Sequence, residues 1–401
     1  MKSIYYAIKI KVNSWMDWVI RLCNRERVKA VKNHHAWARK SILNFYQFVG
    51  DAALLVQQFP RVEAQRYRHS LGNFIFVGMD EKECLSFFRH LDPDLPEIQL
   101  EPIGKYQLWA LPKQVDEWLA NDTDIVLCDL SRLYPFSLHT RFNVTTPIAI
   151  QQVVYLPENI EQYLEGSKFR ELRRIINRAE RTEIVWRFST NKADFDYFYQ
   201  ELYLPYTQER HGIFAVVNSY DLLWKEFIKG GLIMIYKGEE IIAGSLVQAT
   251  RHYGIGQVGG VRDTSPDLVP KKIYGLLVWY SIEWAFKQGV RRFDLGNSYA
   301  LRSNGVYRFK KNFGSMVESQ YGFIFPYRKI LMNNPPEALT ECLNNAGLIC
   351  EKNGKHFGVI LNTGESEKLQ VDYGEALEKA VNEGLAGIVI VHDHRKKYMV
   401  A

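Results

Sequence analysis

Cysteine is scarce in this 401-residue sequence, and no two cysteines form a C-x-x-C pair. The five that occur stand far apart: Cys23, Cys84, Cys128, Cys342 and Cys350. Such an odd, scattered set argues against a disulfide framework and indicates reduced thiols in a cytoplasmic protein. The HDHR run at residues 392–395 has no companion cluster of His or Cys, so we predict no metal site.

Long hydrophobic runs are also lacking. The most apolar stretch, residues 273–286, contains Glu283 and is shorter than the about 20 residues that span a bilayer. At the N-terminus Lys9 and Lys11 interrupt the apolar residues, which argues against a signal peptide. The net charge of +6 is small for a nucleic-acid coat protein but compatible with an anionic, phosphorylated ligand. We therefore expect a cytoplasmic protein with no transmembrane segment and no DNA partner.

Aromatic residues, by contrast, make up 13% of the chain, and the length favours two domains plus an appendage. No internal repeat of fixed period is visible. We predict an N-terminal helical segment (1–59), a first α/β domain (60–145), a second α/β domain (146–330) and a small C-terminal α/β annex (337–401). Pro135 and residues 145–147 are interpreted as a boundary, and the stretch after Tyr327 as a tail.

The second domain has the more regular pattern. Across residues 232–261, three apolar runs separated by short polar turns predict an antiparallel meander. A buried helix follows, with Pro270 in its first turn and Gly289 at its C-terminal cap, and then the strand RRFDLG (291–296). The run NGVYRFKKNFG (304–314) predicts a short basic helix. The expected fold class is α/β (α+β), with a mixed, mainly antiparallel sheet flanked by helices.

The run GIGQVG at residues 254–259 matches the dinucleotide fingerprint G-x-G-x-x-G, but its context does not. In that fingerprint the glycines close a strand and open a helix, whereas these lie inside a strand pattern. Glycine inside a strand indicates close approach of a ligand or of another backbone. We therefore predict that Gln257, Gly259 and Val261 lie along a bound donor, which the strand edge holds by backbone hydrogen bonds.

Acyl transfer to an amine requires an oriented carbonyl, a stabilised oxyanion and removal of a proton from the amine. Asp294, at the end of a strand next to Gly296, is one candidate base, because burial raises the pKa of a carboxyl group. Capping of the following turn is its structural alternative. Glu283, alone on the apolar helix, is a second candidate base with a similar structural alternative.

Basic residues mark three further candidate positions. Lys271 and Lys272 stand at the start of the helix after the meander, where free N–H groups and two cations predict a phosphate site; a solvated helix start is the alternative. Arg210 and His211 end the YTQERH run and are candidates to face the acceptor, although a lone terminal histidine is often a helix-end cation. The basic helix at 168–181 favours either a solvated face or a grip on an anionic acceptor or on tRNA.

Two runs resemble those of a known family. FRELRRIINRAERTEI (169–184) is similar to the basic helix that opens the acyltransferase domain of Fem-type aminoacyltransferases, a branch of the GNAT superfamily. FDLGNS (293–298) followed by GVYRFKKNFG (305–314) resembles the signature that closes this domain, with FK-x-x-FG at its centre. The resemblance covers residues 146–325. It implies a GNAT fold, and a first domain that is a second, degenerate GNAT-like unit.

The resemblance also implies roles for single residues. In Fem-like enzymes the lysine of the FK motif stabilises charge near the transferred acyl group, so this role is expected of Lys310, with Phe309 beside the donor. Arg308 points elsewhere on the helix and is expected to grip substrate phosphates. A surface helix packed through Phe309 and Phe313 is the structural alternative. The chain lacks both the long helical arm of some Fem proteins and the glycine-rich pyrophosphate loop of acetyl-CoA-dependent GNATs.

Three functions remain as alternatives. The first is an N-acyltransferase that moves an acyl group from acyl-CoA, a co-substrate rather than a permanent cofactor, to a primary amine of a sugar, an amino acid or a cell-envelope precursor. The second is an aminoacyl-tRNA-dependent aminoacyltransferase of the peptidoglycan type. The third is a non-catalytic GNAT-fold binding module, whose annex binds a partner. The modest net charge favours acyl-CoA over tRNA as the donor.

Overall fold

The computed structural model describes residues 45–46, 48–53, 55, 62–91, 99–131, 134, 142–166, 169–211, 215, 217–250, 253–262, 270–318, 327–362, 372–392 and 395–400. The chain divides into two compact units. The first unit comprises Met1–Gln151, Asn297–Arg308 and Val317–Ala401, and the second comprises Gln152–Gly296 and Phe309–Met316. The predicted N-terminal helical segment lies outside the described residues except for a short helical piece near residue 50. The four domains drawn from the sequence stay a prediction.

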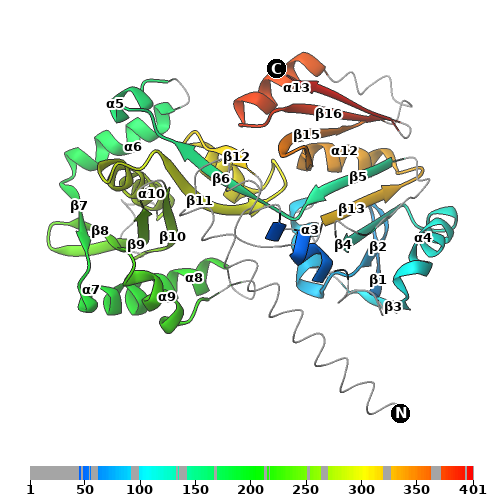
Figure 1. Cartoon of the computed structure of the whole chain (residues 1–401), viewed down its shortest axis with the longest axis horizontal. Helices are drawn as coiled ribbons and strands as arrows, with labels where there is room; N and C mark the ends of the chain where they lie inside the picture. The colour runs from blue at the N-terminus through cyan, green and yellow to red at the C-terminus, as the bar shows by residue number, and fades with distance from the viewer. Residues whose placement is uncertain are drawn as a thin grey trace, which may run out of the picture. The chain divides into compact units, whose positions relative to one another are not determined.

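A six-stranded sheet forms the centre of the first unit, in the order β3-β1-β2-β4-β13-β5 (Figure 1). Its strands are β1 (Val62–His69), β2 (Gly72–Val77), β3 (Glu101–Tyr106), β4 (Ile125–Leu130), β5 (Phe142–Pro147) and β13 (Tyr327–Met332). Their connections include α3 (Glu81–Leu91), the short helix η1 (Leu108–Ala110) and α4 (Leu111–Ala120). β2 and β4 run parallel, whereas the other neighbours are antiparallel. Apolar side chains of α3 and α4 belong to two separate cores, each shared with strands of this sheet.

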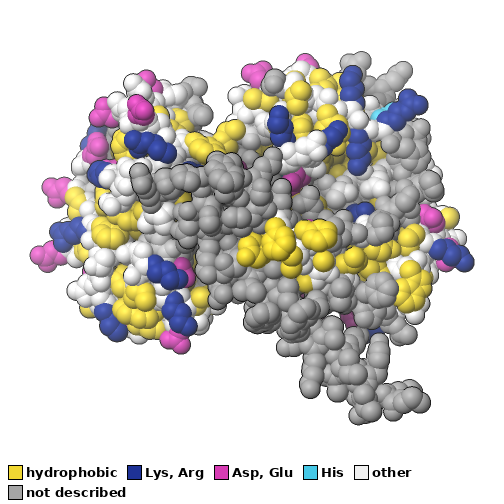
Figure 2. Space-filling model, viewed as in Figure 1, with side chains coloured by type: hydrophobic (Ala, Val, Ile, Leu, Met, Phe, Trp, Pro, Cys, Tyr) yellow, Lys and Arg dark blue, Asp and Glu magenta, His cyan; other side chains and the backbone are white. Residues whose placement is uncertain are grey.

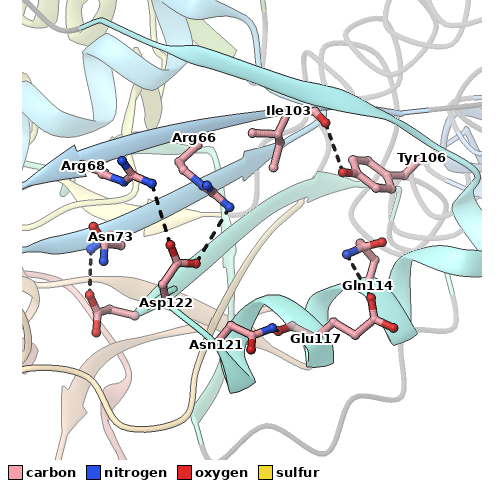
Figure 3. A network of polar contacts seen from close by, with 10 residues as sticks. Arg66, Arg68, Asn73, Ile103, Tyr106, Gln114, Glu117, Asn121 and Asp122 are labelled. Carbon is pink, nitrogen blue, oxygen red and sulfur yellow. Dashed lines mark hydrogen bonds and ion pairs between the residues drawn. The ribbon is translucent and has the colours of Figure 1, made fainter.

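Two aspartates fix the turn between α4 and β4 (Figure 3). The Asp122 carboxylate lies 3.9 Å from Arg66 and 3.8 Å from Arg68, both on β1. The backbone N–H of Asn73 on β2 donates to Asp124 Oδ2 at 2.7 Å. These contacts hold the start of β4 against β1 and β2, two strands that precede it by about fifty residues.

A buried ion pair crosses the middle of this sheet. Arg328 on β13 donates from Nε and Nη2 to the two carboxylate oxygens of Asp129 on β4, at 2.8 and 2.7 Å. The Arg328 guanidinium also lies 5.2 Å from the centroid of the Phe87 ring. The prediction of a tail after Tyr327 is therefore wrong, because β13 is a central strand between β4 and β5. Residues 145–147, interpreted as a boundary, lie at the end of β5.

A four-stranded sheet in the order β14-β15-β16-β17 completes the described part of the first unit. Its elements are α12 (Glu337–Ala346), β14 (Ile349–Lys352), β15 (Lys355–Leu361), α13 (Tyr373–Asn382), β16 (Gly387–His392) and β17 (Arg395–Val400). β15 and β16 are parallel and are flanked by antiparallel β14 and β17. Val359 and Val389 share one core with Phe74 and Leu339, so the predicted annex packs on the same core as the first α/β domain.

A seven-stranded sheet in the order β12-β6-β11-β10-β9-β8-β7 forms the centre of the second unit. Its strands are β6 (Ala149–Tyr155), β7 (Ile184–Ser189), β8 (Gly231–Lys237), β9 (Glu240–Thr250), β10 (Tyr253–Val261), β11 (Arg292–Tyr299) and β12 (Met316–Glu318). β8, β9 and β10 are consecutive antiparallel neighbours, which confirms the predicted meander. The strand predicted at 291–296 is β11, which returns to the same sheet and runs parallel to β10.

Helices cover both faces of this sheet. They are α5 (Ile160–Tyr163), α6 (Arg170–Arg181), α7 (Lys192–Tyr197), the π-helical turn η3 (Phe198–Tyr203), α8 (Leu204–His211), α9 (Tyr220–Phe227), α10 (Pro270–Lys287) and α11 (Gly305–Lys311). Apolar residues of α6 and α10 pack in one core, and those of α7, η3 and α9 pack in a second core that takes other side chains of β8 and β9. The predicted burial of the helix after the meander is confirmed, since Ile273, Leu276 and Ala285 are almost inaccessible.

The expected fold class is confirmed: mixed, mainly antiparallel sheets are flanked by helices. The glycine run 254–259 lies inside β10, so it does not open a helix and is not a dinucleotide fingerprint. The two large sheets share one feature. Each contains two parallel strands that are connected through at least one helix: β2 and β4 in the first unit, and β10 and β11 in the second. In each sheet one strand of this pair also has an antiparallel neighbour, β1 beside β2 and β9 beside β10. This shared arrangement agrees with two GNAT-like units.

Gly260→Ala is expected to destabilise the protein by about 1–3 kcal/mol, because overpacking a buried site forces backbone shifts. A Cβ at residue 260 would lie 2.3 Å from the backbone C and O atoms of Leu202 in η3. Gly305→Ala is the matched control, since a Cβ there meets no atom within 4 Å. Urea unfolding followed by tryptophan fluorescence measures both. Equal unfolding free energies for the two variants would contradict this close approach of η3 to β10.

Candidate active site

The site is organised by the place where β10 and β11 pair. Their parallel ladder covers only two residue pairs, Gly254 with Phe293 and Ile255 with Asp294. Just beyond it, the register of β10 against β9 shifts between Gly256 and Gly259, which marks a bulge. The part of β10 from residue 256 onward is therefore outside the β11 ladder. This is the strand edge that the sequence analysis assigned to the donor.

Asp294 lies at the end of the β10–β11 ladder and is 2% exposed. Tyr253, the first residue of β10, donates its hydroxyl hydrogen to Asp294 Oδ2. The backbone N–H of Gly296 donates to Asp294 Oδ1 at 2.6 Å. The Arg292 guanidinium, two residues earlier on β11, lies 4.9 Å from the centroid of the Tyr253 ring. Asp294 is thus buried, and it accepts the Gly296 N–H as a cap of the following turn would; its role as a base stays a prediction.

Lys310 approaches Asp294 from α11. Its side chain is buried, and its Nζ lies 3.8 Å from the position that a Cβ would take at Gly296. Gly296 has a φ of +79°, in the left-handed region that glycine adopts without strain. The backbone of the β11 turn thus favours glycine at residue 296, and the lysine amine lies in ordinary contact distance of it. Lys310 and Asp294, both chosen from the sequence, come together.

Burial perturbs the titration of this group of residues. Burial lowers the pKa of Lys310 to about 7, although the negative charge of Asp294 acts to raise it. Burial raises the pKa of Asp294, while the hydrogen bonds from Tyr253 and Gly296 and the nearby Arg292 and Lys310 oppose that rise. The pKa of Tyr253 is raised by its burial and by the Asp294 charge. Strongly perturbed and mutually coupled groups of this kind are a common mark of functional sites.

A row of aromatic rings connects the FK motif to Arg210. Phe309 lies 5.7 Å from Tyr274 on α10, and Tyr274 stacks on Tyr206 of α8 at 5.6 Å, measured between ring centroids. The exposed Arg210 guanidinium lies 5.5 Å from the Tyr206 centroid and 5.6 Å from the Tyr274 centroid, and donates to the Tyr206 hydroxyl. Phe309 and Arg210, predicted separately as donor-side and acceptor-side residues, are therefore ends of one aromatic row.

Hydrogen bonds anchor the turn that ends the FK motif. Tyr163 donates its hydroxyl hydrogen to the carbonyl oxygen of Phe313, and Lys311 donates from Nζ to the carbonyl oxygen of Ser315. Gln152 Nε2 donates to Ser315 Oγ at 3.0 Å. Gly314 has a φ of +66°, and a Cβ there would lie 2.8 Å from the Phe169 ring. The glycine that closes FK-x-x-FG is thus required by this turn.

The donor-side residues of β10 lie in different surroundings. The Gln257 side chain donates to Glu226 Oε2 of α9 at 3.1 Å, so its amide is already engaged. A Cβ at Gly259 would lie 3.1 Å from Leu277 and 3.3 Å from Tyr274, both on α10. Val261 is buried and pairs with Ala243 of β9. The Gln257 amide is thus engaged with α9, and contact of this stretch with a donor stays a prediction.

Other predicted residues lie apart from Lys310 or are only partly described. Glu283 forms an ion pair with Lys287, one turn later on α10, at 2.6 Å, and this partly exposed pair does not support Glu283 as a base. Arg308 is exposed on α11, and Lys272 is half-buried in the first turn of α10. The side chains of His211 and Lys271 lie outside the described residues, so their predicted roles stay predictions.

Four residues of the site were not predicted from the sequence: Tyr253, Arg292, Tyr206 and Tyr274. Tyr253 and Asp294 are 41 residues apart and meet only because β10 and β11 pair in parallel around an intervening helix. One signal was available. Tyr206 and Arg210 stand four residues apart on one helix, a spacing that places two side chains on the same face.

Within the described parts of the chain, no cluster of three or more His, Cys, Asp or Glu side chains is arranged to hold a metal ion. The same described residues include no helix whose length and apolar character suffice to cross a membrane.

Residues 166–311 match the model of the acetyltransferase (GNAT) domain family. This match includes β7–β11 and Lys310, so the predicted GNAT domain is confirmed for this part of the chain. No curated protein matches the sequence.

Solved structures with a similar fold include FemX, with 10% identity and a TM-score of 0.36, covering 78% of this chain and 96% of that one. The C-terminal domain of a lysylphosphatidylglycerol synthetase from Agrobacterium fabrum has 13% identity and a TM-score of 0.34, and covers 79% of this chain and 95% of that one. L-PGS from Bacillus licheniformis has 14% identity and a TM-score of 0.34, over 74% and 90% of the two chains. At these identities and TM-scores we draw no conclusion from the likeness.

Proposed function

We propose that the second unit transfers an acyl group from acyl-CoA to a primary amine of a sugar, an amino acid or a cell-envelope precursor, and that it does so in the cytoplasm. One observation carries this proposal: a buried lysine, Lys310, stands beside a buried carboxylate, Asp294, where a bulged strand leaves its parallel neighbour. Burying two charged groups costs stability, so their presence together in a GNAT domain points to chemistry rather than to packing.

Each part of the reaction has a candidate group. The backbone of β10 beyond residue 255 lies outside the β11 ladder and is suited to hold an extended donor by hydrogen bonds. The first turn of α10, with Lys272, is the group we propose for the phosphates, because the N–H groups of a first helical turn lack intrahelical partners. In its protonated form, Lys310 stabilises the oxyanion that develops on the acyl carbonyl. Arg210, exposed at the end of the aromatic row, is the group we propose for a polar part of the acceptor.

The charge pattern of the surface supports a small anionic donor. On the face seen in Figure 2, acidic and basic side chains are interspersed over the part of the molecule that contains α6–α9. Binding of a large polyanionic donor is favoured by an extended, positively charged surface, whereas the phosphates of CoA need only a few cations.

One observation favours the second candidate, an aminoacyl-tRNA donor. Four exposed arginines follow one side of α6 at spacings of four, four and three residues: Arg170, Arg174, Arg178 and Arg181. Arg174 is partly neutralised by Glu171, to which it donates at 2.8 Å. Such a row matches the phosphates of a nucleic-acid backbone, although it also fits a solvated helix face.

The donor is tested by ligand-linked stability. Acetyl-CoA at one hundred times its dissociation constant is expected to raise the free energy of unfolding by about 2.7 kcal/mol, because it binds only the folded protein. The increase is expected to depend weakly on salt. A stabilisation by aminoacyl-tRNA that disappears steeply with salt, with none by acyl-CoA, would instead support the tRNA donor. No stabilisation by either would support a non-catalytic binding module.

A further inference from the structure

The geometry around Asp294 argues against this carboxylate as the group that takes the substrate proton. One of its oxygens accepts from the Tyr253 hydroxyl, and the other accepts from the Gly296 N–H at 2.6 Å. Hydrogen bonds to a charged carboxylate stabilise the charged form and oppose protonation. Only 2% of Asp294 is exposed, so a substrate amine has little access to either oxygen.

Lys310 is better placed for this proton. Its amine stands beside Gly296, 3.8 Å from the position that a Cβ would take there, and Lys310 is 8% exposed. The charged group that acts on it is Asp294 of β11. Asp294 in turn interacts with Tyr253 of β10 and with Arg292 of β11. Its neighbours on α11 act elsewhere, since Arg308 is exposed and Lys311 donates to the Ser315 carbonyl.

We propose that Tyr253 is a positioning residue: its hydrogen bond keeps Asp294 in the charged form. The charged Asp294 in turn positions Lys310, which exchanges protons with the substrates. This inference rests on the proposed acyl transfer. Tyr253 acts through Asp294, whereas Lys310 is the catalytic residue. The alternative role of the Tyr253 hydroxyl is to satisfy a buried carboxylate for stability only.

The proton balance of the step is complete with these groups. The neutral Lys310 amine accepts a proton from the nucleophilic amine as the new C–N bond forms at the acyl carbonyl. The resulting ammonium faces the oxyanion, which is the charge-stabilising role expected of this lysine. When the C–S bond of a thioester, or the C–O bond of an ester, breaks, the ammonium gives its proton to the leaving group. Lys310 then returns to its neutral form, and no further reactant is needed.

The protonation of Lys310 is therefore set by two opposing effects. Burial lowers the pKa of its ammonium to about 7, and the negative charge of Asp294 raises it. Loss of the Tyr253 hydroxyl removes one hydrogen bond from the Asp294 carboxylate, which raises the pKa of that carboxyl and weakens its charge. We expect the pKa of Lys310 in Tyr253→Phe to fall by about one unit, equivalent to about 1.4 kcal/mol of lost interaction.

The test measures this titration directly, without donor or acceptor. The full-length protein is acylated with trace acetic anhydride between pH 5 and pH 10, and the labelling of each lysine is quantified by mass spectrometry of its peptides. We expect a midpoint near pH 7 for Lys310 in the wild type and about one unit lower in Tyr253→Phe. Asp294→Asn, which keeps the shape of the side chain, is expected to lower the labelling midpoint of Lys310 at least as far. Tyr236→Phe, on β8, is the matched control and is expected to leave it unchanged.

A Lys310 midpoint near that of surface lysines, no labelling of Lys310 at any pH, or equal midpoints in the wild type and Tyr253→Phe would overturn the inference. Near-ultraviolet circular dichroism of each variant checks that the fold is kept. The test is independent of the proposed function. If neither acyl-CoA nor aminoacyl-tRNA is a donor, the proposed function is contradicted, but the labelling midpoints still test the inference about Tyr253. If the protein is an active acyltransferase and Lys310 titrates near pH 10, the proposed function holds and this inference is contradicted.

Discussion

Lys310→Ala is expected to reduce the turnover number by about 100- to 1000-fold, the loss seen when one group that stabilises an oxyanion is removed. The Michaelis constants are expected to change much less, because the lysine acts mainly in the transition state. Its burial and its position beside Asp294 and Gly296 make this the residue with the largest predicted effect on the reaction. Steady-state kinetics with acetyl-CoA and an accepted amine provide the measurement.

Lys310→Arg is expected to rescue only a small part of this loss. The guanidinium is planar, longer and always charged, so it keeps a cation near the site but neither the geometry of the amine nor its ability to lose a proton. Lys311→Ala is the matched control on the same helix, since its Nζ donates to the Ser315 carbonyl and its loss is expected to affect stability more than turnover. A Lys310→Ala protein with near-normal turnover and a raised Michaelis constant would make Lys310 a phosphate ligand instead.

Asp129→Ala is expected to lower the free energy of unfolding by about 3–5 kcal/mol, because it leaves the Arg328 charge buried without its partner. The pair lies on adjacent central strands, with side chains 0% and 7% exposed, and shares two hydrogen bonds of 2.7 and 2.8 Å. Burial lowers the pKa of Arg328, but the charge and hydrogen bonds of Asp129, together with Glu83, raise it more, so the guanidinium stays charged. Arg328→Met is expected to cost a similar amount for the same reason.

The double variant Asp129→Leu/Arg328→Met provides the control. Replacing a whole buried ion pair with apolar residues is often close to neutral, whereas removing one partner is not. Urea unfolding of the two single variants and of the double variant completes a mutant cycle. A double variant as unstable as the sum of the two single variants would show that the two charges do not compensate each other.

The second unit was largely predictable from local patterns. Alternating apolar runs in residues 232–261 identified the meander, and Pro270 marked the start of the buried helix. β13 was missed because its partners β4 and β5 lie almost two hundred residues earlier, and a short apolar strand carries no local sign of such pairing. The Asp129–Arg328 pair was missed for the same reason.

The candidate site was found only in part. Resemblance to the FK-x-x-FG signature identified Lys310, and the end of an apolar strand identified Asp294. Tyr253 was missed, since its contact with Asp294 depends on the short parallel ladder between β10 and β11. Glu283 was chosen as a lone carboxylate on an apolar helix, yet Lys287 one turn away gives it an ordinary ion pair. Sequence spacing thus identified candidates within single elements, whereas pairing between elements decided which of them meet.

The central claim is that this GNAT domain transfers an acyl group by way of Lys310. The most direct test is the release of free thiol from acetyl-CoA by the purified full-length protein, with a panel of amino sugars and amino acids as acceptors. We expect amine-dependent thiol release by the wild type and at least about 100-fold less by Lys310→Ala. Equal release by the two proteins would contradict the role of Lys310, and the absence of transfer from both acyl-CoA and aminoacyl-tRNA would contradict the proposed activity.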